Sequence, residues 1–292
     1  MRPPYRLDLT AIVLRRLSTN AVDVFDGRAY RRLLGDPADP VLLTVEQTAL
    51  DALHVRIEGA NAAAFDPHAI VRRMLGTGVD LAPFYHGAAR VPWLHAIAQR
   101  ARGVRPPRYP SLWETACNAI VYQQISIHAA GAILRRVIER YARPHHAGDV
   151  RLLPFPSPRT LLDADPPELR ALGLSVHKVN ALNAVGAAIE AGELDENALE
   201  TLPTPRLLEV LVAHKGIGPW TAAVIALRGF GRLDVFPMKD SGVARALRTM
   251  SGDPAVEAEP VIDALRPQQG MLYYHLLLGR LDATGEVSLN PI

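Results

Sequence analysis

The chain has 292 residues, of which 49% are hydrophobic and 21% are charged, and its formal net charge is +2. This composition is typical of a globular protein with one large or two to three smaller domains. The single cysteine, Cys117, excludes a disulfide framework and any metal or iron–sulfur site built from four cysteines. Neither a membrane-spanning apolar run nor a secretory signal pattern is visible, so we expect a cytoplasmic protein with no membrane partner.

The first 80 residues differ in pattern from the rest. After a short helical stretch at 10–17, β-branched segments at 22–25, 41–45 and 53–57 alternate with turn signals and are predicted to be strands. Residues 65–75 are then predicted to form a helix that is capped near Asp66. We therefore expect an N-terminal α+β domain with an antiparallel sheet.

From about residue 80 onward the pattern is helical. The proline-rich stretch 104–110 is expected to be extended, and Ser111 with Glu114 forms a capping-box pattern that opens the next helix. Lys178 is expected either to contact phosphate or to be solvated. Apolar spacing and caps predict helices at 93–102, 111–121, 127–141, 158–163, 166–172, 176–191, 261–265 and 271–281.

Residues 203–247 contain two helices joined by a tight turn, Gly216-Ile217-Gly218. Thr204 is expected to cap the first helix, and Pro219 opens the second. Two glycines allow positive φ angles and close approach of a ligand, and the second helix N-terminus favours an anion such as phosphate. A Gly-x-Gly pair alone indicates this weakly, because many glycine pairs only form turns.

The continuation of this segment makes the pattern specific. It reads Gly229-Phe230-Gly231, then Asp234-Val235-Phe236-Pro237, then Asp240 before another helix. Over about forty positions the segment resembles the helix-hairpin-helix DNA glycosylases, and within them the branch of 3-methyladenine DNA glycosylase II. The resemblance rests on Leu211, Gly216-Ile217-Gly218, Trp220-Thr221-Ala222, Leu227-Arg228-Gly229, Asp234-Val235-Phe236-Pro237 and Asp240.

The resemblance implies a mainly α-helical fold in which two helical subdomains flank an active-site cleft, beside the N-terminal α+β domain. The expected units are residues 1–80, residues 81–110 together with 231–292, and residues 111–230. The last unit contains the helix-hairpin-helix at about 205–228.

Asp240 is the expected catalytic residue, and a helix N-cap is the alternative role for it; the two roles are compatible. Glycosidic cleavage passes through an oxocarbenium-like sugar, which a fixed carboxylate stabilises. Asp234 is expected to hold the loop, for example by pairing with Arg228. The absence of a second carboxylate favours an alkylated purine, because such a base already carries a positive charge and leaves without being protonated.

The resemblance places Trp220 in the wall of the base pocket, where relatives that cleave the DNA strand carry a lysine; a core position is the alternative. Gln123, Tyr122 and Leu277 are the other expected pocket residues. Leu277 and Val224 stand where relatives supply a tryptophan and a tyrosine. Tyr122, Tyr273 and Tyr274 are candidates to replace those aromatic rings, and a less aromatic pocket with these tyrosines in the core is the alternative.

The resemblance also implies the DNA contacts. Gln124 takes the place of the side chain that fills the gap left by the extruded nucleotide, whereas two solvated glutamines at a helix end are the alternative for Gln123 and Gln124. A monovalent cation, Na⁺ or K⁺, is expected on the backbone carbonyls of Val212, His214 and Ile217, and no other cofactor is required. The remaining expected DNA-binding residues are Gly216, Ile217, Gly218, Pro219 and Thr221.

The expected function is that of a monomeric, monofunctional DNA glycosylase of base excision repair. It would act on double-stranded DNA that contains a damaged base, extrude an alkylated purine of the 3-methyladenine type, and leave an abasic site. The alternatives are a glycosylase for hypoxanthine or uracil, and a non-catalytic helix-hairpin-helix protein that only binds DNA. A protein that only binds DNA has no use for Asp240, which favours the enzyme.

Overall fold

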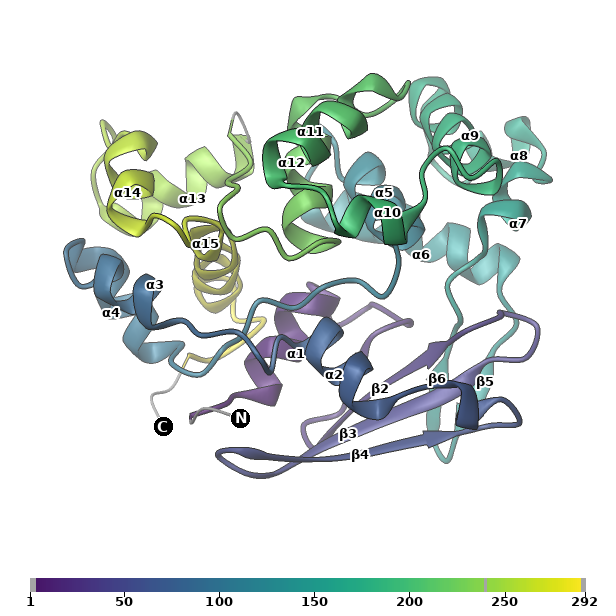
Figure 1. The fold of residues 1–292 in the computed structure, drawn as a ribbon, viewed down its shortest axis with the longest axis horizontal. Coiled ribbons are helices and arrows are strands. Elements are labelled where there is room, and N and C mark those ends of the chain that lie inside the picture. The colour runs from purple at the N-terminus through teal and green to yellow at the C-terminus, as the bar shows by residue number, and fades with distance from the viewer. Residues whose placement is uncertain (1–3, 239–240, 290–292) are drawn as a thin grey trace.

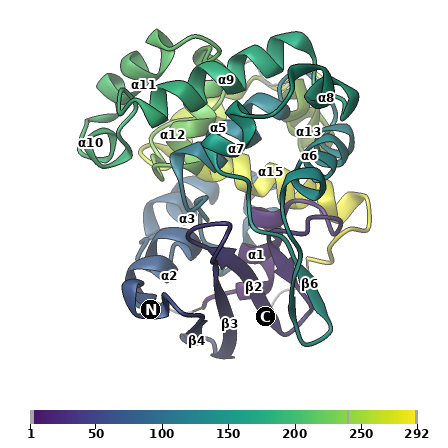
Figure 2. The ribbon, with the colours of Figure 1, turned by 90° about the vertical axis from the view of Figure 1, so that its right-hand side faces the viewer.

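The computed structural model describes residues 4–238 and 241–289, and it is mainly helical with a small N-terminal sheet (Figure 1). The chain begins with α1 (Leu7–Arg15), and the helix α2 (Pro67–Leu75) follows the sheet. Both pack on the sheet side of the molecule, whereas the helices between residues 112 and 228 lie above it in the view of Figure 2. The strands are β1 (Val24–Phe25), β2 (Ala29–Leu34), β3 (Val41–Ala49) and β4 (Ala52–Glu58).

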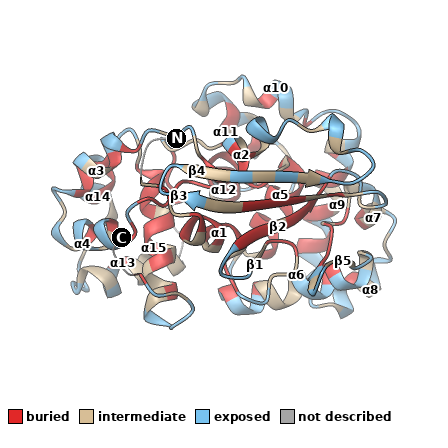
Figure 3. Ribbon diagram, turned by 90° about the horizontal axis from the view of Figure 1, so that it is seen from below, coloured by how far each residue is buried: buried red, intermediate tan, exposed pale blue. Residues whose placement is uncertain are grey.

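The four strands form an antiparallel sheet in the order β1-β2-β3-β4, and Val45 of β3 lies between Tyr30 and Val55 of its two neighbours. The inner strand β2 is almost fully buried, while the edge strand β4 alternates between exposed and half-buried residues (Figure 3). This alternation is the expected pattern of a sheet with one solvated face. The predicted N-terminal α+β domain is thus confirmed.

The rest of the described chain is helical apart from one small hairpin, β5 (His145–Ala147) and β6 (Val150–Leu152). The mainly α-helical fold class is therefore confirmed. The remaining elements are η1 (Ala62–Ala64), α3 (Ala82–Ala88), α4 (Pro92–Arg100), α5 (Leu112–Val121), α6 (Ile127–Tyr141), α7 (Pro158–Leu162), α8 (Pro166–Ala171), α9 (Val176–Glu190), α10 (Glu196–Glu200), α11 (Thr204–Ala213), α12 (Pro219–Arg228), α13 (Ser241–Ser251), α14 (Ala258–Leu265) and α15 (Gly270–Ala283).

Serine caps open the helices that frame the centre of the molecule. The hydroxyls of Ser126 and Ser175 accept the backbone N–H groups of Ala129 and Lys178 at the starts of α6 and α9. The predicted cap at Thr204 is wrong, because α11 begins at Thr204 itself and its hydroxyl instead donates to the carboxylate of Asp234 at 3.1 Å.

Three large hydrophobic cores and one small cluster around Leu153 hold the described part of the molecule together. One lies between the sheet, α1 and α2, and includes Tyr30 and Leu43. A second is built by α5, α9, α11 and α12, and a third by α3, α4, α14 and α15. On the basis of these cores we propose the division into residues 1–80, residues 81–110 with 231–292, and residues 111–230. Val13 of the first range packs in the third core, which joins α1 to the C-terminal helices.

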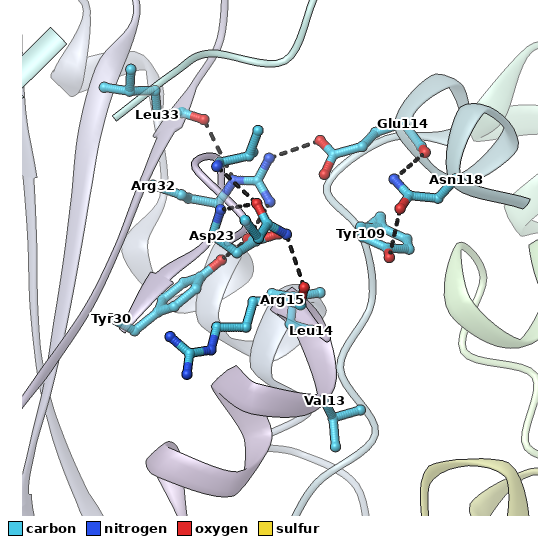
Figure 4. Close-up of polar contacts among 12 residues, drawn as sticks. Val13, Leu14, Arg15, Asp23, Tyr30, Arg32, Leu33, Tyr109, Glu114 and Asn118 are labelled. Carbon is cyan, nitrogen blue, oxygen red and sulfur yellow. Dashed lines mark hydrogen bonds and ion pairs between the residues drawn. The ribbon is translucent and has the colours of Figure 1, made fainter. Parts of the chain in front are cut away.

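A buried ion cluster connects the sheet to α5. Arg32 of β2 donates to Asp23 at 2.8 Å and to Glu114 of α5 at 2.7 Å, and Tyr30 donates to the same Asp23 oxygen at 2.6 Å (Figure 4). The Ser111 hydroxyl accepts the Glu114 N–H at 3.1 Å, so half of the predicted capping box forms. The Glu114 carboxylate binds Arg32 and thereby joins two cores.

Among the residues that the structure describes, no helix has both the length and the apolar character needed to cross a membrane.

Candidate active site

The predicted helix-hairpin-helix is formed by α11 and α12. The N–H of Ile217 donates to the carbonyl of His214 at 3.1 Å and closes the turn between the helices. Gly218 precedes α12 and Pro219 occupies its first turn, as the sequence predicts. The positive end of the α12 dipole therefore lies at this turn, which favours an anion there.

The two glycines of the turn serve different purposes. Gly216 has φ 93°, and a Cβ at this position would stand 2.6 Å from the Cβ of Ala181 on α9. Only glycine, which has no Cβ, adopts this positive φ without strain and also avoids the contact with Ala181. Gly218 has φ −85°, so the predicted need for positive φ is wrong at this residue. A Cβ at Gly218 would meet no protein atom within 4 Å, which leaves its face open to a ligand.

This turn borders a cleft of about 890 Å³. The cleft lies between the hairpin, the junction of α5 and α6, and the helices α13 and α15, which stand on the opposite side from α11 and α12 in Figure 1. Its lining residues are Arg16, Tyr122, Gln123, Gln124, Ile125, Ser126, Ile127, His177, Val212, His214, Gly216, Ile217, Gly218, Pro219, Trp220, Thr221, Gly242, Val243, Arg245, Ala246, Tyr273, Leu276, Leu277 and Arg280.

The structure brings most of the predicted site residues that it describes together in this cleft. The expected pocket, DNA-binding and cation-site residues all line the cleft. Asp240 lies outside the described residues, although Gly242 and Val243, which follow it closely in the chain, line the cleft. The roles assigned to these residues stay predictions.

The loop between α5 and α6 is held against the hairpin. The side-chain amide of Gln123 donates to the hydroxyl of Thr221 on α12 at 2.6 Å. Gln124 is exposed and has φ 58°, a left-handed conformation that is uncommon for residues other than glycine. Ile125 beside it is 39% exposed, so a polar and an apolar side chain stand together at this loop.

The helix α15 supplies one wall through residues at helical spacing. Tyr273, Leu277 and Arg280 lie on one face and line the cleft. Tyr273 therefore lies where an aromatic ring could replace the expected one. Tyr274 is fully buried, and Val224 is 1% exposed within the core of α12, so neither contributes to the cleft.

The charge on the cleft wall is positive. Arg16, Arg245 and Arg280 line it, and among the lining residues that the structure describes there is no carboxylate. The aromatic side chains of Tyr122, Trp220 and Tyr273 are half-buried there, so a flat base can stack on their rings.

Two expected polar contacts are not observed. Lys178 neither faces solvent nor is placed for a phosphate, because its side chain is buried and donates to the carbonyl of Val121, at the end of α5, at 2.7 Å. Arg228 is fully buried and donates to the carbonyl of Val13 at 3.0 Å, so the suggested pair with Asp234 is wrong. Asp234 holds the loop through Thr204 instead.

Sequence reasoning missed the three cleft arginines. The positions of Arg280 and Leu277, three residues apart on a predicted helix, could have indicated a shared face. Arg16 had no such signal, because it comes from the N-terminal region and reaches the cleft only through the tertiary fold.

Known proteins are similar to this chain in sequence and in fold. A family model described as "HhH-GPD superfamily base excision DNA repair protein" matches residues 117–265. The DNA-3-methyladenine glycosylase 2 of Escherichia coli is 33% identical over 240 residues, which are 80% of this chain and 81% of that protein. A "probable bifunctional transcriptional activator/DNA repair enzyme AlkA" of Mycobacterium tuberculosis is 35% identical over 180 residues.

That match covers 61% of this chain and 35% of the Mycobacterium tuberculosis protein, so the chain spans about a third of that relative's length. The solved structure of a 3-methyladenine DNA glycosylase from Archaeoglobus fulgidus has a TM-score of 0.79 and 23% identity, and the match covers 96% of this chain and 97% of that one. This likeness shows the fold. The family match over half of the chain and the Escherichia coli relative together show that the protein belongs to the HhH-GPD superfamily of base excision DNA repair proteins.

Proposed function

We propose that the protein is a monofunctional DNA glycosylase that releases an alkylated purine of the 3-methyladenine type from duplex DNA and leaves an abasic site. One observation carries the proposal: the expected base-pocket, hairpin and cation-site residues in the described part of the chain line one cleft of about 890 Å³. A cleft of this size accommodates an extruded nucleotide. The names of the Escherichia coli and Archaeoglobus fulgidus proteins support the same class of lesion.

The proposed chemistry is hydrolysis with Asp240 as the carboxylate. The bond between C1′ and the base nitrogen breaks, and its electron pair leaves with the base, so that a cationic purine departs as a neutral molecule. Asp240 stabilises the oxocarbenium-like sugar and orients the water that adds to C1′. Gly242 and Val243 on the cleft wall support this role, because they follow Asp240 by only two and three residues.

The proposed absence of strand cleavage follows from Trp220. Its half-buried ring lines the cleft where a nucleophilic amine would otherwise stand, and the described part of that wall contains no lysine. Without an amine, the sugar is not attacked covalently by the protein. Trp220 is also suited to stacking on a cationic base, an attraction of about 0.5–2 kcal/mol.

The proposed DNA contact runs through the hairpin and the glutamine loop. The open face of Gly218 and the α12 N-terminus would bind a phosphate of the backbone. Gln124, exposed beside Ile125, would occupy the gap that the extruded nucleotide leaves. Neither contact requires a strongly basic protein, since backbone amides position the DNA.

A monovalent cation is part of the proposal. The carbonyl of Val212 comes from the last turn of α11, where helix carbonyls lack partners within the helix, and those of His214 and Ile217 come from the turn that follows. The His214 carbonyl also accepts the N–H of Ile217, which leaves one lone pair for an ion. Oxygen ligands of this kind fit Na⁺ or K⁺. When bound, the ion would stiffen the turn, and we propose that the enzyme needs no other cofactor and acts as a monomer.

A panel of duplexes tests the function. Each duplex carries one modified base: 7-methylguanine, 3-methyladenine, hypoxanthine or uracil. We expect release of alkylated purines, abasic sites that break only on later alkali treatment, and no covalent adduct after borohydride. A protein that binds these duplexes tightly but releases no base would be the non-catalytic alternative, and preferential release of uracil would favour a glycosylase for another lesion.

A further inference from the structure

Tyr122 stands between two cavities. Its side chain lines the cleft of about 890 Å³ and also a small interior cavity of about 30 Å³, which has room for about one water molecule. Its hydroxyl faces Gly131 of α6, where an added Cβ would lie 3.5 Å from the hydroxyl oxygen. Close packing fixes a side chain only where atoms fill the surrounding volume, so a ring that borders two cavities needs a further, directional contact.

Arg16 supplies that contact. Its Cζ lies 4.1 Å from the centroid of the Tyr122 ring, and the two side chains also share a hydrogen bond. Arg16 is 5% exposed, and a cation over an aromatic ring is worth more when it is sheltered from water. The guanidinium therefore holds both the ring and the hydroxyl of Tyr122.

The backbone of Arg16 is unusual in a way that fits this contact. Arg16 follows the last residue of α1 with φ 64° and ψ −57°, and the N–H of Leu17 donates to the carbonyl of Arg15 at 2.8 Å across it. These values describe a γ-turn with positive φ at its centre, which is rare and strained. A non-glycine residue held in such a turn points to a local requirement for its side chain.

Arg16 also joins three parts of the chain at the cleft. It comes from the N-terminal region, Tyr122 ends α5, and Tyr273, a further electrostatic neighbour of the guanidinium, comes from α15. All three residues line the cleft. Gln123, the next residue after Tyr122, is held to the hairpin through Thr221. The loop after α5 is thus held by the hairpin through one residue and by the N-terminal region through the other.

We propose that Arg16 is a positioning residue for base release: it fixes the Tyr122 ring as a wall on which the extruded base stacks. The proposal rests on the proposed function of the same cleft and goes beyond it, because it gives the N-terminal α+β domain a part in base release. Arg16 acts through Tyr122 and not on the base, so its effect is the same for every alkylated purine that stacks on this wall.

A fixed ring favours release by pre-organisation. If the Tyr122 ring is free to turn, the entering base must order it, and that ordering opposes the seating of the base. The rate of release follows the fraction of bound duplex whose base is seated in the pocket. Stacking of one base on an aromatic side chain is worth about tenfold or more in affinity, so loss of the fixed ring should slow release by about tenfold.

A double-mutant cycle tests the coupling. Single-turnover release of 7-methylguanine from a duplex, with a binding titration on the same duplex, is measured for the wild type, Arg16→Met, Tyr122→Leu and the double variant. We expect each single variant to release the base about tenfold more slowly. Duplex affinity should stay within about threefold, because the proposed hairpin contact is unchanged. The double variant should also lose about tenfold, whereas independent effects would multiply to about hundredfold.

Arg15→Met is the matched control. Arg15 belongs to the same turn, donates to the carbonyl of Phe25 at 3.1 Å and does not line the cleft. Its variant should release 7-methylguanine within about threefold of the wild-type rate. If Arg16→Met does not fold, Arg16→Gly takes its place in the cycle, because glycine adopts the positive φ without strain.

The possible outcomes separate the two proposals. A wild type that releases no base from any lesion duplex contradicts the proposed function, and the role of Arg16 falls with it. A wild type that releases 7-methylguanine no faster than Arg16→Met overturns the role of Arg16 and leaves the glycosylase standing. So does an Arg16 substitution that slows release by more than about threefold when the Tyr122 ring is already absent, because Arg16 then acts through another group. A smaller further loss supports the role.

Discussion

His275 is a fully buried imidazole on α15, in the helix that forms one wall of the cleft. Its Nδ1 lies 2.9 Å from the carbonyl of Met271, and its ring centroid is 4.5 Å from that of Phe84. Its Nε2 has no partner within the described structure. Burial lowers the pKa of His275 to about 4, so the neutral ring is the form that packs in this core.

The stability of the protein should therefore depend on pH through His275. Below the unfolded pKa of about 6.5, the unfolded chain binds a proton that the folded chain rejects. The contribution of His275 is complete above that pH and is lost as pH falls toward 4. We expect the unfolding free energy to fall by about 2–3 kcal/mol more in the wild type than in His275→Leu between pH 7 and pH 4.5. Denaturant unfolding at the two pH values measures this, and equal slopes for both proteins would contradict it.

The hairpin element depends on its two glycines in different ways. Gly216 is required for folding, because its φ of 93° and the 2.6 Å approach to Ala181 both exclude a side chain. Gly218 is not required by the fold, since its backbone is ordinary and its Cβ direction is open, and we propose that only the DNA contact requires it. The fold therefore requires Gly216, whereas the proposed DNA contact requires Gly218.

Alanine at each position should separate these requirements. Gly216→Ala is expected to lower the unfolding free energy by about 1–3 kcal/mol through strain and crowding. Gly218→Ala should leave stability within about 0.5 kcal/mol of the wild type and weaken DNA binding, because its methyl group faces the proposed phosphate. Thermal unfolding and a DNA titration on both variants are the measurements. Undiminished DNA affinity in Gly218→Ala would exclude the hairpin as the contact.

At the scale of the whole molecule, a buried ion cluster connects two of the hydrophobic cores. Arg32, Asp23 and Glu114 are all buried, and they connect the sheet to α5, which carries the glutamine loop at its end (Figure 4). Removing one member of such a cluster leaves uncompensated charges, whereas removing all of its charges does not.

Arg32→Met is accordingly expected to lower the unfolding free energy by about 3–5 kcal/mol, since two buried carboxylates lose their cation. The matched triple variant, with Asp23→Asn and Glu114→Gln added, should recover at least half of the loss. Denaturant unfolding of both proteins measures the effect. A single variant as stable as the wild type would show that the cluster does not hold the two cores together.

The buried ion cluster also explains why strand β2 could not be predicted from the sequence. The strand β2 has the sequence AYRRLL, in which two arginines break the apolar pattern of a buried strand. Arg32 is buried there only because Asp23 and Glu114 neutralise it, and Glu114 lies 82 residues away in the chain. The short elements α3, α10 and β5–β6 were missed because their few residues show no clear period.

The parts of the site that lie within single segments of the chain could be predicted from the sequence. The hairpin and the glutamine loop follow from glycine spacing and helix caps within single segments, and the structure places them on one cleft. The arginines of the cleft, and the buried positions of Tyr274 and Val224, depend on contacts between distant helices. No local pattern carries that information.

We propose that the cleft hydrolyses a glycosidic bond with Asp240 as its carboxylate. Asp240→Asn retains shape and capping ability but removes the charge. Single-turnover release of 7-methylguanine from a duplex, with a binding titration on the same duplex, is the direct test. We expect a loss of about 10²–10³-fold in the rate of release with lesion binding retained. Release at nearly the wild-type rate would contradict it and leave Asp240 as a helix cap alone.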